Sequence, residues 1–147
     1  MTILVIHGPN VQWLGRRQPD LDGTADLQAI NRELRRLAAA RKVAVEIMQS
    51  NHEGEIVERI GAAHGRCQAM VINPAAYTHT SVAIRDAIEA CRVPTVEVHL
   101  SNIYAREPFR QPSLIAPVCA GQVSGFGSSS YRLGLEAAIA IVKRKRG

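Results

Sequence analysis

An imidazole, a hydroxyl and an amide follow one apolar run of the chain, at His99, Ser101 and Asn102. Histidine suits general acid or base catalysis because it exchanges its proton near neutral pH. The loop that follows carries Arg106 and Arg110, and guanidinium groups bind carboxylates through paired hydrogen bonds. This stretch predicts a site for an oxygen-rich anion. The alternative is a histidine at a strand end beside solvated arginines.

Two other apolar runs end in the same way. His7 and Asn10 follow the first run, and Asn73 and His79 follow the third. If these runs are parallel strands of one sheet, their carboxyl ends meet at one edge, where ligands bind in such sheets. Three strand ends would then contribute to one site, which favours an enzyme.

The elements that must position these residues alternate along the chain. Apolar runs predict five strands, at 3–6, 43–48, 69–72, 95–100 and within 116–124. Apolar residues at three- and four-residue spacing predict helices around 27–37, 56–60, 82–88 and 133–142. Thr24 is the expected N-cap of the first helix, and Thr80 or Ser81 that of the third. The alternation predicts an α/β fold in a single domain, 1–147, with a parallel sheet between two layers of helices.

Composition excludes several classes of protein. Of the 147 residues, 46% are hydrophobic and 21% charged, which is ordinary for a globular domain. No apolar run approaches the roughly 20 residues that a membrane helix needs, and the N-terminal run is expected to be a strand and not a signal peptide. Three cysteines without a C-x-x-C pair indicate neither a disulfide framework nor a thiolate zinc site, and they fit a reducing cytoplasm.

Charge and loop composition predict no nucleic acid, metal or cofactor. The net charge of +5 is concentrated around 32–42 and at 143–146, and only 4% of residues are aromatic, so no nucleic-acid face is expected. His79 and His99 lack a third ligand at a suitable spacing for a metal. The loop 8–15 is bulky and offers few free amides, which is unlike a phosphate-binding loop.

Three blocks of the sequence resemble the type II 3-dehydroquinate dehydratases. They are IHGPN (6–10) with LGRRQP (14–19), NPAAYTHTS (73–81) with RDA (85–87), and EVHLSN (97–102) with REPFR (106–110). The resemblance implies a flavodoxin-like fold, a cytoplasmic location, no cofactor, and usually a homododecamer of trimeric units. It also implies removal of water from 3-dehydroquinate, by anti elimination through an enolate.

The resemblance assigns the catalytic roles by position. His99 matches the general acid that protonates the leaving hydroxyl, and Glu97 matches its orienting partner. Asn73 matches the residue that stabilises the enolate through a water. Arg17 matches the arginine that lowers the pKa of the base, and Asp22 occupies the position of that base.

The resemblance also implies how a cyclic hydroxy acid is bound. His79, Asp86 and Arg110 match residues that bind substrate hydroxyls. Leu100 and Ser101 match the pair whose backbone amides hold the substrate carboxylate. The complete substrate-binding set is Asn73, His79, Asp86, Leu100, Ser101 and Arg110.

The base position differs from the family pattern. The family has a tyrosine there, whereas this chain has Asp22 before Gly23. A carboxylate is a weaker base than a phenolate, and a neighbouring Arg17 would lower its pKa further. A second hypothesis therefore stands beside the enzyme: a non-catalytic relative that binds a quinate-like ligand or serves as a subunit.

Overall fold

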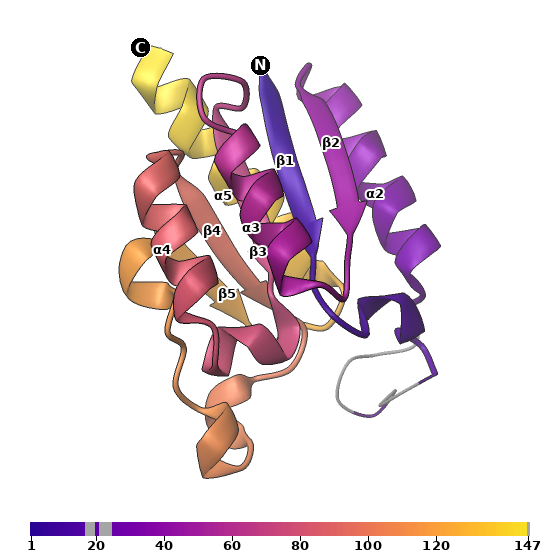
Figure 1. Ribbon diagram of the computed structural model, residues 1–147. Coiled ribbons are helices and arrows are strands. Elements are labelled where there is room, and N and C mark those ends of the chain that lie inside the picture. Colours follow the sequence, from indigo (N-terminus) through magenta and orange to yellow (C-terminus); the bar gives the residue numbers. More distant parts are fainter. Residues whose placement is uncertain (17–19, 21–24, 147) are drawn as a thin grey trace.

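One parallel sheet of five strands forms the centre of the molecule (Figure 1). The computed structural model describes residues 1–16, 20 and 25–146. The strands lie in the order β2-β1-β3-β4-β5 and pair in parallel. Their bounds are Thr2–His7 for β1, Ala44–Gln49 for β2, Ala69–Asn73 for β3, Thr95–His99 for β4 and Gly121–Ser124 for β5. The predicted sheet is confirmed.

Helices cover both faces of this sheet, as predicted. Helices α2 and α5 enclose a hydrophobic cluster on one face, and α3 and α4 enclose a second cluster on the other (Figure 1). Their bounds are Leu27–Ala40 for α2, Glu53–Ala62 for α3, Val82–Cys91 for α4 and Ser129–Arg146 for α5. Among the helices of the described residues, none combines the length and apolar character needed to cross a membrane.

Short 3-10 helices form much of the loops around the sheet. They are η1 (Val11–Trp13), η2 (Ala75–His79), η3 (Ile103–Ala105), η4 (Pro108–Arg110) and η5 (Ala116–Val118). The last of these accounts for the first part of the segment predicted to hold the fifth strand. Pro117 has no N–H to donate to a sheet ladder, and pairing with β4 begins only at Gly121.

The first helix is capped differently from the prediction. Asp26 is the N-cap of α2, and its side chain accepts a hydrogen bond from the backbone nitrogen of Ala29 at 2.8 Å. The assignment of this cap to Thr24, which lies outside the described residues, is therefore wrong. Aspartate caps as well as threonine, and Asp26 directly precedes the helix. Ser81 caps α4 as predicted, accepting from the backbone nitrogen of Ile84 at 2.9 Å.

The side chains of strand β4 are apolar on one face of the sheet and ionisable on the other. Successive side chains of a strand point to opposite faces of the sheet. Val96 and Val98 pack in the cluster of α2 and α5, so Glu97 and His99 project to the opposite face. Both are buried, with Glu97 fully so. The strand thus carries an ionisable pair at its carboxyl end.

Gly8 lets β1 and β3 end close together. Its backbone nitrogen donates to the carbonyl oxygen of Asn73 at 2.7 Å. A Cβ at this position would lie 2.6 Å from the carbonyl oxygen of Pro74, which is too close for any side chain. Because glycine has no side chain, the loop after β1 can lie beside Asn73, where the site is.

Candidate functional site

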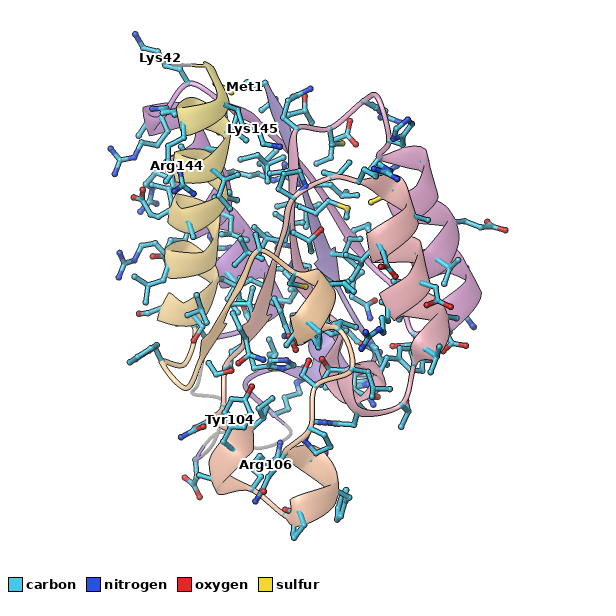
Figure 2. The ribbon with its side chains drawn as sticks, turned by 90° about the vertical axis from the view of Figure 1, so that its left-hand side faces the viewer. Met1, Lys42, Tyr104, Arg106, Arg144 and Lys145 are labelled. Atoms are coloured by element: carbon cyan, nitrogen blue, oxygen red, sulfur yellow. The ribbon has the colours of Figure 1, made fainter. Side chains whose placement is uncertain are left out.

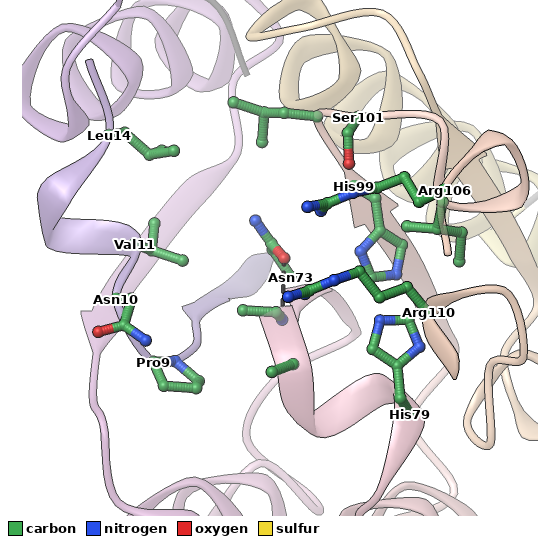
Figure 3. A pocket seen from close by; sticks show the side chains of 14 residues that line it. Pro9, Asn10, Val11, Leu14, Asn73, His79, His99, Ser101, Arg106 and Arg110 are labelled. Atoms are coloured by element: carbon green, nitrogen blue, oxygen red, sulfur yellow. Dashed lines mark hydrogen bonds between the residues drawn. The ribbon is translucent and has the colours of Figure 1, made fainter. Parts of the chain in front are cut away.

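A pocket lies at the carboxyl ends of β1, β3 and β4 (Figure 3). Figure 3 shows Asn10, Val11 and Leu14 on one side, and both arginines and both histidines on the other, with Asn73 between them. Its lining is Pro9, Asn10, Val11, Leu14, Asn73, Ala75, Ala76, His79, His99, Leu100, Ser101, Ile103, Arg106 and Arg110. The predicted convergence of three strand ends on one site is confirmed.

His99 and Glu97 form a buried, hydrogen-bonded pair at this site. Nε2 of His99 lies 2.5 Å from Oε2 of Glu97. The hydroxyls of Thr78 and Ser113 also donate to this carboxylate. Burial alone would raise the pKa of Glu97, but the hydrogen bond and charge of His99, with the two hydroxyls, outweigh it and lower the pKa. The carboxylate is therefore ionised at neutral pH.

Asn73 is held on two sides of its amide. Its Nδ2 donates to the hydroxyl of Tyr131 at 2.9 Å, and its Oδ1 accepts from the backbone nitrogen of Ala75 at 3.0 Å. The side chain is buried yet lines the pocket. An amide held in this way presents its remaining N–H to a ligand or to a water.

His79 is oriented as a hydrogen-bond acceptor. Its Nδ1 lies 2.8 Å from the carbonyl oxygen of Pro112 and must carry the proton, because a carbonyl only accepts. Burial lowers the pKa of His79, as do the nearby His99 and Arg110. The neutral ring leaves Nε2 free to accept a hydrogen bond from a ligand hydroxyl.

Two arginines, Arg106 and Arg110, point into the pocket (Figure 3). Nε of Arg110 donates to Glu107 at 2.6 Å, and its guanidinium lies 5.1 Å from the ring centre of Phe109. Arg106 shares the pocket, and the resemblance had given it no role. Together with Leu100 they make this wall suited to a carboxylate.

The basic residues around 32–42 and at 143–146, for which no nucleic-acid face is expected, lie away from the pocket. Figure 2 shows Arg106 and Tyr104 at one end of the molecule and Lys42, Arg144 and Lys145 at the other. Arg106 marks the pocket end. The charge at the end of α5 is therefore separate from the site.

Not every predicted residue lines this pocket. His7 was expected at its rim, but its side chain is fully buried among Tyr131 and Asn31, so that expectation is wrong. Asp86 lies on the exposed side of α4 and does not line the pocket. Arg17 and Asp22 lie outside the described residues.

The apolar wall of the pocket was not anticipated. Val11, Leu14 and Ile103 line it, and apolar residues carry no chemical signal that separates a pocket wall from a core.

Among residues 1–16, 20 and 25–146, no three His, Cys, Asp or Glu side chains are grouped so as to hold a metal ion.

The strand order 2-1-3-4-5 and a polar pocket at the carboxyl ends define a flavodoxin-like α/β protein. The family described as dehydroquinase class II matches residues 1–139. A 3-dehydroquinate dehydratase of Acaryochloris marina is 56% identical over 138 residues, covering 94% of this chain and 93% of that protein. One of Trichodesmium erythraeum is 55% identical over 143 residues, covering 97% and 95%.

Solved structures of the same family are also similar to this chain. The type II dehydroquinase of Butyrivibrio crossotus superposes with a TM-score of 0.91 at 39% identity, covering 97% of each chain. A 3-dehydroquinate dehydratase-like protein of Bifidobacterium longum gives a TM-score of 0.72 at 29% identity, covering 97% of this chain and 98% of that one. The chain belongs to the class II dehydroquinase family.

Proposed function

We propose that this protein is a lyase that converts 3-dehydroquinate to 3-dehydroshikimate and water. The observation that carries the proposal is that His99, hydrogen-bonded to Glu97, lines one pocket with Asn73 and two arginines. Membership of the class II dehydroquinase family supports it. The reaction removes a proton next to a ketone, forms an enolate, and then expels a hydroxyl by anti elimination.

His99 is the general acid of this reaction. Its Nε2 is held by Glu97 at 2.5 Å, which leaves Nδ1 as the nitrogen that gives a proton to the leaving hydroxyl. The buried carboxylate of Glu97 stabilises the imidazolium before that proton is transferred. A positioned acid of this kind contributes about 10²- to 10⁴-fold to a rate.

Asn73 stabilises the enolate intermediate. Its amide is already oriented, and a donor fixed before reaction stabilises developing negative charge at little reorganisation cost. A water between the amide and the enolate oxygen would carry this effect. His79 accepts a hydrogen bond from a substrate hydroxyl, and Arg110 binds another.

The substrate carboxylate is held where β4 ends. Leu100 and Ser101 line the pocket next to Arg106, and we assign the carboxylate to their backbone amides, with the guanidinium balancing its charge. Fixing this group orients the ring between His99 and the opposite wall, as an anti elimination requires.

The position that the family's base occupies lies in the loop that carries Arg17 and Asp22. Arg17 would favour the deprotonated form of any acid beside it. Asp22, in place of the family's tyrosine, favours a second candidate function, that of a relative that binds a quinate-like acid without turning it over. These two functions differ in turnover and agree in ligand, so one pair of measurements separates them.

The proposal also covers the oligomeric state of the protein and its location in the cell. We propose that the chain forms a homododecamer of trimeric units in the cytoplasm, without cofactor, metal, nucleic-acid or membrane partner. Asp86, which lies outside its own chain's pocket, would then bind substrate in the pocket of a neighbouring copy. Sedimentation of the wild type beside Asp86→Arg tests whether the assembly forms and whether Asp86 contributes to it.

The test of function is a turnover assay with a binding assay beside it. Purified protein is mixed with 3-dehydroquinate, and the conjugated enone of the product is followed by ultraviolet absorbance. Turnover that His99→Ala removes supports the lyase. Binding of quinate in a calorimeter without turnover supports the second candidate. Folded protein that does neither contradicts both.

A further inference from the structure

Buried polar side chains connect the pocket floor to the layer of α2 and α5. Nδ2 of Asn73 lies 2.9 Å from the hydroxyl of Tyr131, which lies 2.7 Å from Nδ1 of His7. Nε2 of His7 lies 2.9 Å from Oδ1 of Asn31. His7 and Tyr131 are buried and do not line the pocket. Neither has a role in the reaction as proposed above.

The direction of these hydrogen bonds follows from Asn31. An amide oxygen only accepts, so Nε2 of His7 carries a proton. Burial lowers the pKa of His7 to about 4, against the opposing effect of the Asn31 hydrogen bond, so the ring is neutral at neutral pH. Its Nδ1 is then a bare acceptor. Tyr131 donates its proton to Nδ1, and its oxygen accepts from Asn73.

Ala75 requires the same orientation of the Asn73 amide. The backbone N–H of Ala75 donates to Oδ1 of Asn73 at 3.0 Å. Reversing the amide would set two donors against each other at Ala75 and two acceptors against each other at Tyr131. Unmatched buried groups of this kind are costly. Both contacts therefore direct the second N–H of Asn73 toward the pocket.

We propose that Tyr131 and His7 are positioning residues, which hold Asn73 with an N–H donor toward the bound ligand. The inference rests on the proposed function, in which that donor stabilises the enolate oxygen. A preorganised donor acts chiefly where charge develops in the transition state. Losing the orientation therefore lowers kcat more than it raises KM.

The kinetic test compares variants of these two residues. Tyr131→Phe removes the hydroxyl. His7→Gln places an amide near the position of Nε2 and removes the acceptor at Nδ1, whereas His7→Asn places an oxygen near the position of Nδ1 and restores that acceptor. The control is Thr95→Val, which removes another buried hydroxyl, one that donates to the carbonyl of Val93 away from the pocket.

We expect Tyr131→Phe and His7→Gln to lower kcat about tenfold, with KM within about twofold of the wild type. His7→Asn should recover most of the lost kcat, and Thr95→Val should keep the wild-type value. Equal activity of His7→Asn and His7→Gln would overturn the proposal. So would a fall in kcat in Thr95→Val that matches the fall in Tyr131→Phe.

A measurement without substrate separates this inference from the proposed function. NMR of protein labelled at asparagine side chains reports the exchange of the two Asn73 amide protons, assigned by their loss in Asn73→Asp. One proton should exchange slowly in the wild type and in His7→Asn, and faster in His7→Gln. If the wild type turns over no 3-dehydroquinate, the proposed function fails and this exchange pattern still decides the positioning role. Equal, fast exchange of both wild-type protons contradicts it.

Discussion

Nε2 of His99 lies 2.5 Å from Oε2 of Glu97, and both side chains project from the same face of β4 because they are two residues apart. The carboxylate also accepts hydrogen bonds from the hydroxyls of Thr78 and Ser113. A strand end thus fixes both the position of the ring and the charge that stabilises its protonated form. The consequence is that ring and carboxylate act as one unit.

Glu97→Gln should lower kcat by about 10²-fold or more, because the amide keeps the shape but loses the charge that stabilises the imidazolium. The enone assay measures this, and circular dichroism verifies the fold. Thr78→Val is the matched control, since it removes one donor to the carboxylate and leaves its charge. Its loss of kcat should be smaller. A Glu97→Gln protein as active as the wild type would show that the carboxylate has no such role.

His99→Ala should abolish elimination while ligand affinity falls only modestly. A general acid acts chiefly in the transition state, so its removal affects kcat far more than ground-state binding. Calorimetry with quinate measures affinity beside the turnover assay. Arg110→Ala is a useful comparison, because loss of a binding group should weaken affinity. Unchanged turnover in His99→Ala would make the assignment of the acid wrong.

Much of this arrangement could be predicted from the sequence. The β-branched runs indicated the buried strands, and their polar ends indicated the site. His7 was misplaced because burial depends on contacts with Tyr131 and Asn31, which are 124 and 24 positions away in the chain. Tyr131 gave no signal of its own, since an aromatic residue on the buried side of a helix is typical of a core.

His7 should make the protein less stable in mild acid. Its pKa is about 4 in the folded protein, mainly because of burial, against 6.5 in the unfolded chain. Between these values the unfolded state binds more protons, so the contribution is complete above pH 6.5 and is lost as the pH falls toward 4. The loss is about 3 kcal/mol. Urea unfolding across this range measures it.

The control for this pH dependence is His7→Asn, which cannot titrate. The lowered pKa of His79 acts in the same direction over the same range. Glu97 contributes at lower pH. Its folded pKa is depressed below 4.5, so its contribution to stability is complete above pH 4.5 and is lost as the pH falls through the folded pKa. The difference between wild type and variant therefore isolates His7. A difference that does not change with pH would contradict the buried, neutral ring.

Asp22 stands where the family has its catalytic tyrosine. If Asp22 is a vestige of a lost base, Asp22→Tyr should raise turnover by about 10²- to 10⁴-fold, since Arg17 still favours a phenolate. If Asp22 has been recruited as the base, Asp22→Asn should remove activity and Asp22→Tyr should not help.

Recruitment would require a carboxylate whose pKa is raised toward neutrality, and a neighbouring Arg17 lowers it. We therefore expect the vestige. The enone assay on wild type, Asp22→Tyr and Asp22→Asn decides between the two accounts, with sedimentation and quinate binding as controls for assembly and fold. An Asp22→Tyr protein that binds quinate, keeps its assembly and gains no activity would contradict the vestige account. It would then favour a substrate whose acidic proton lies closer to a carboxylate than to a phenol.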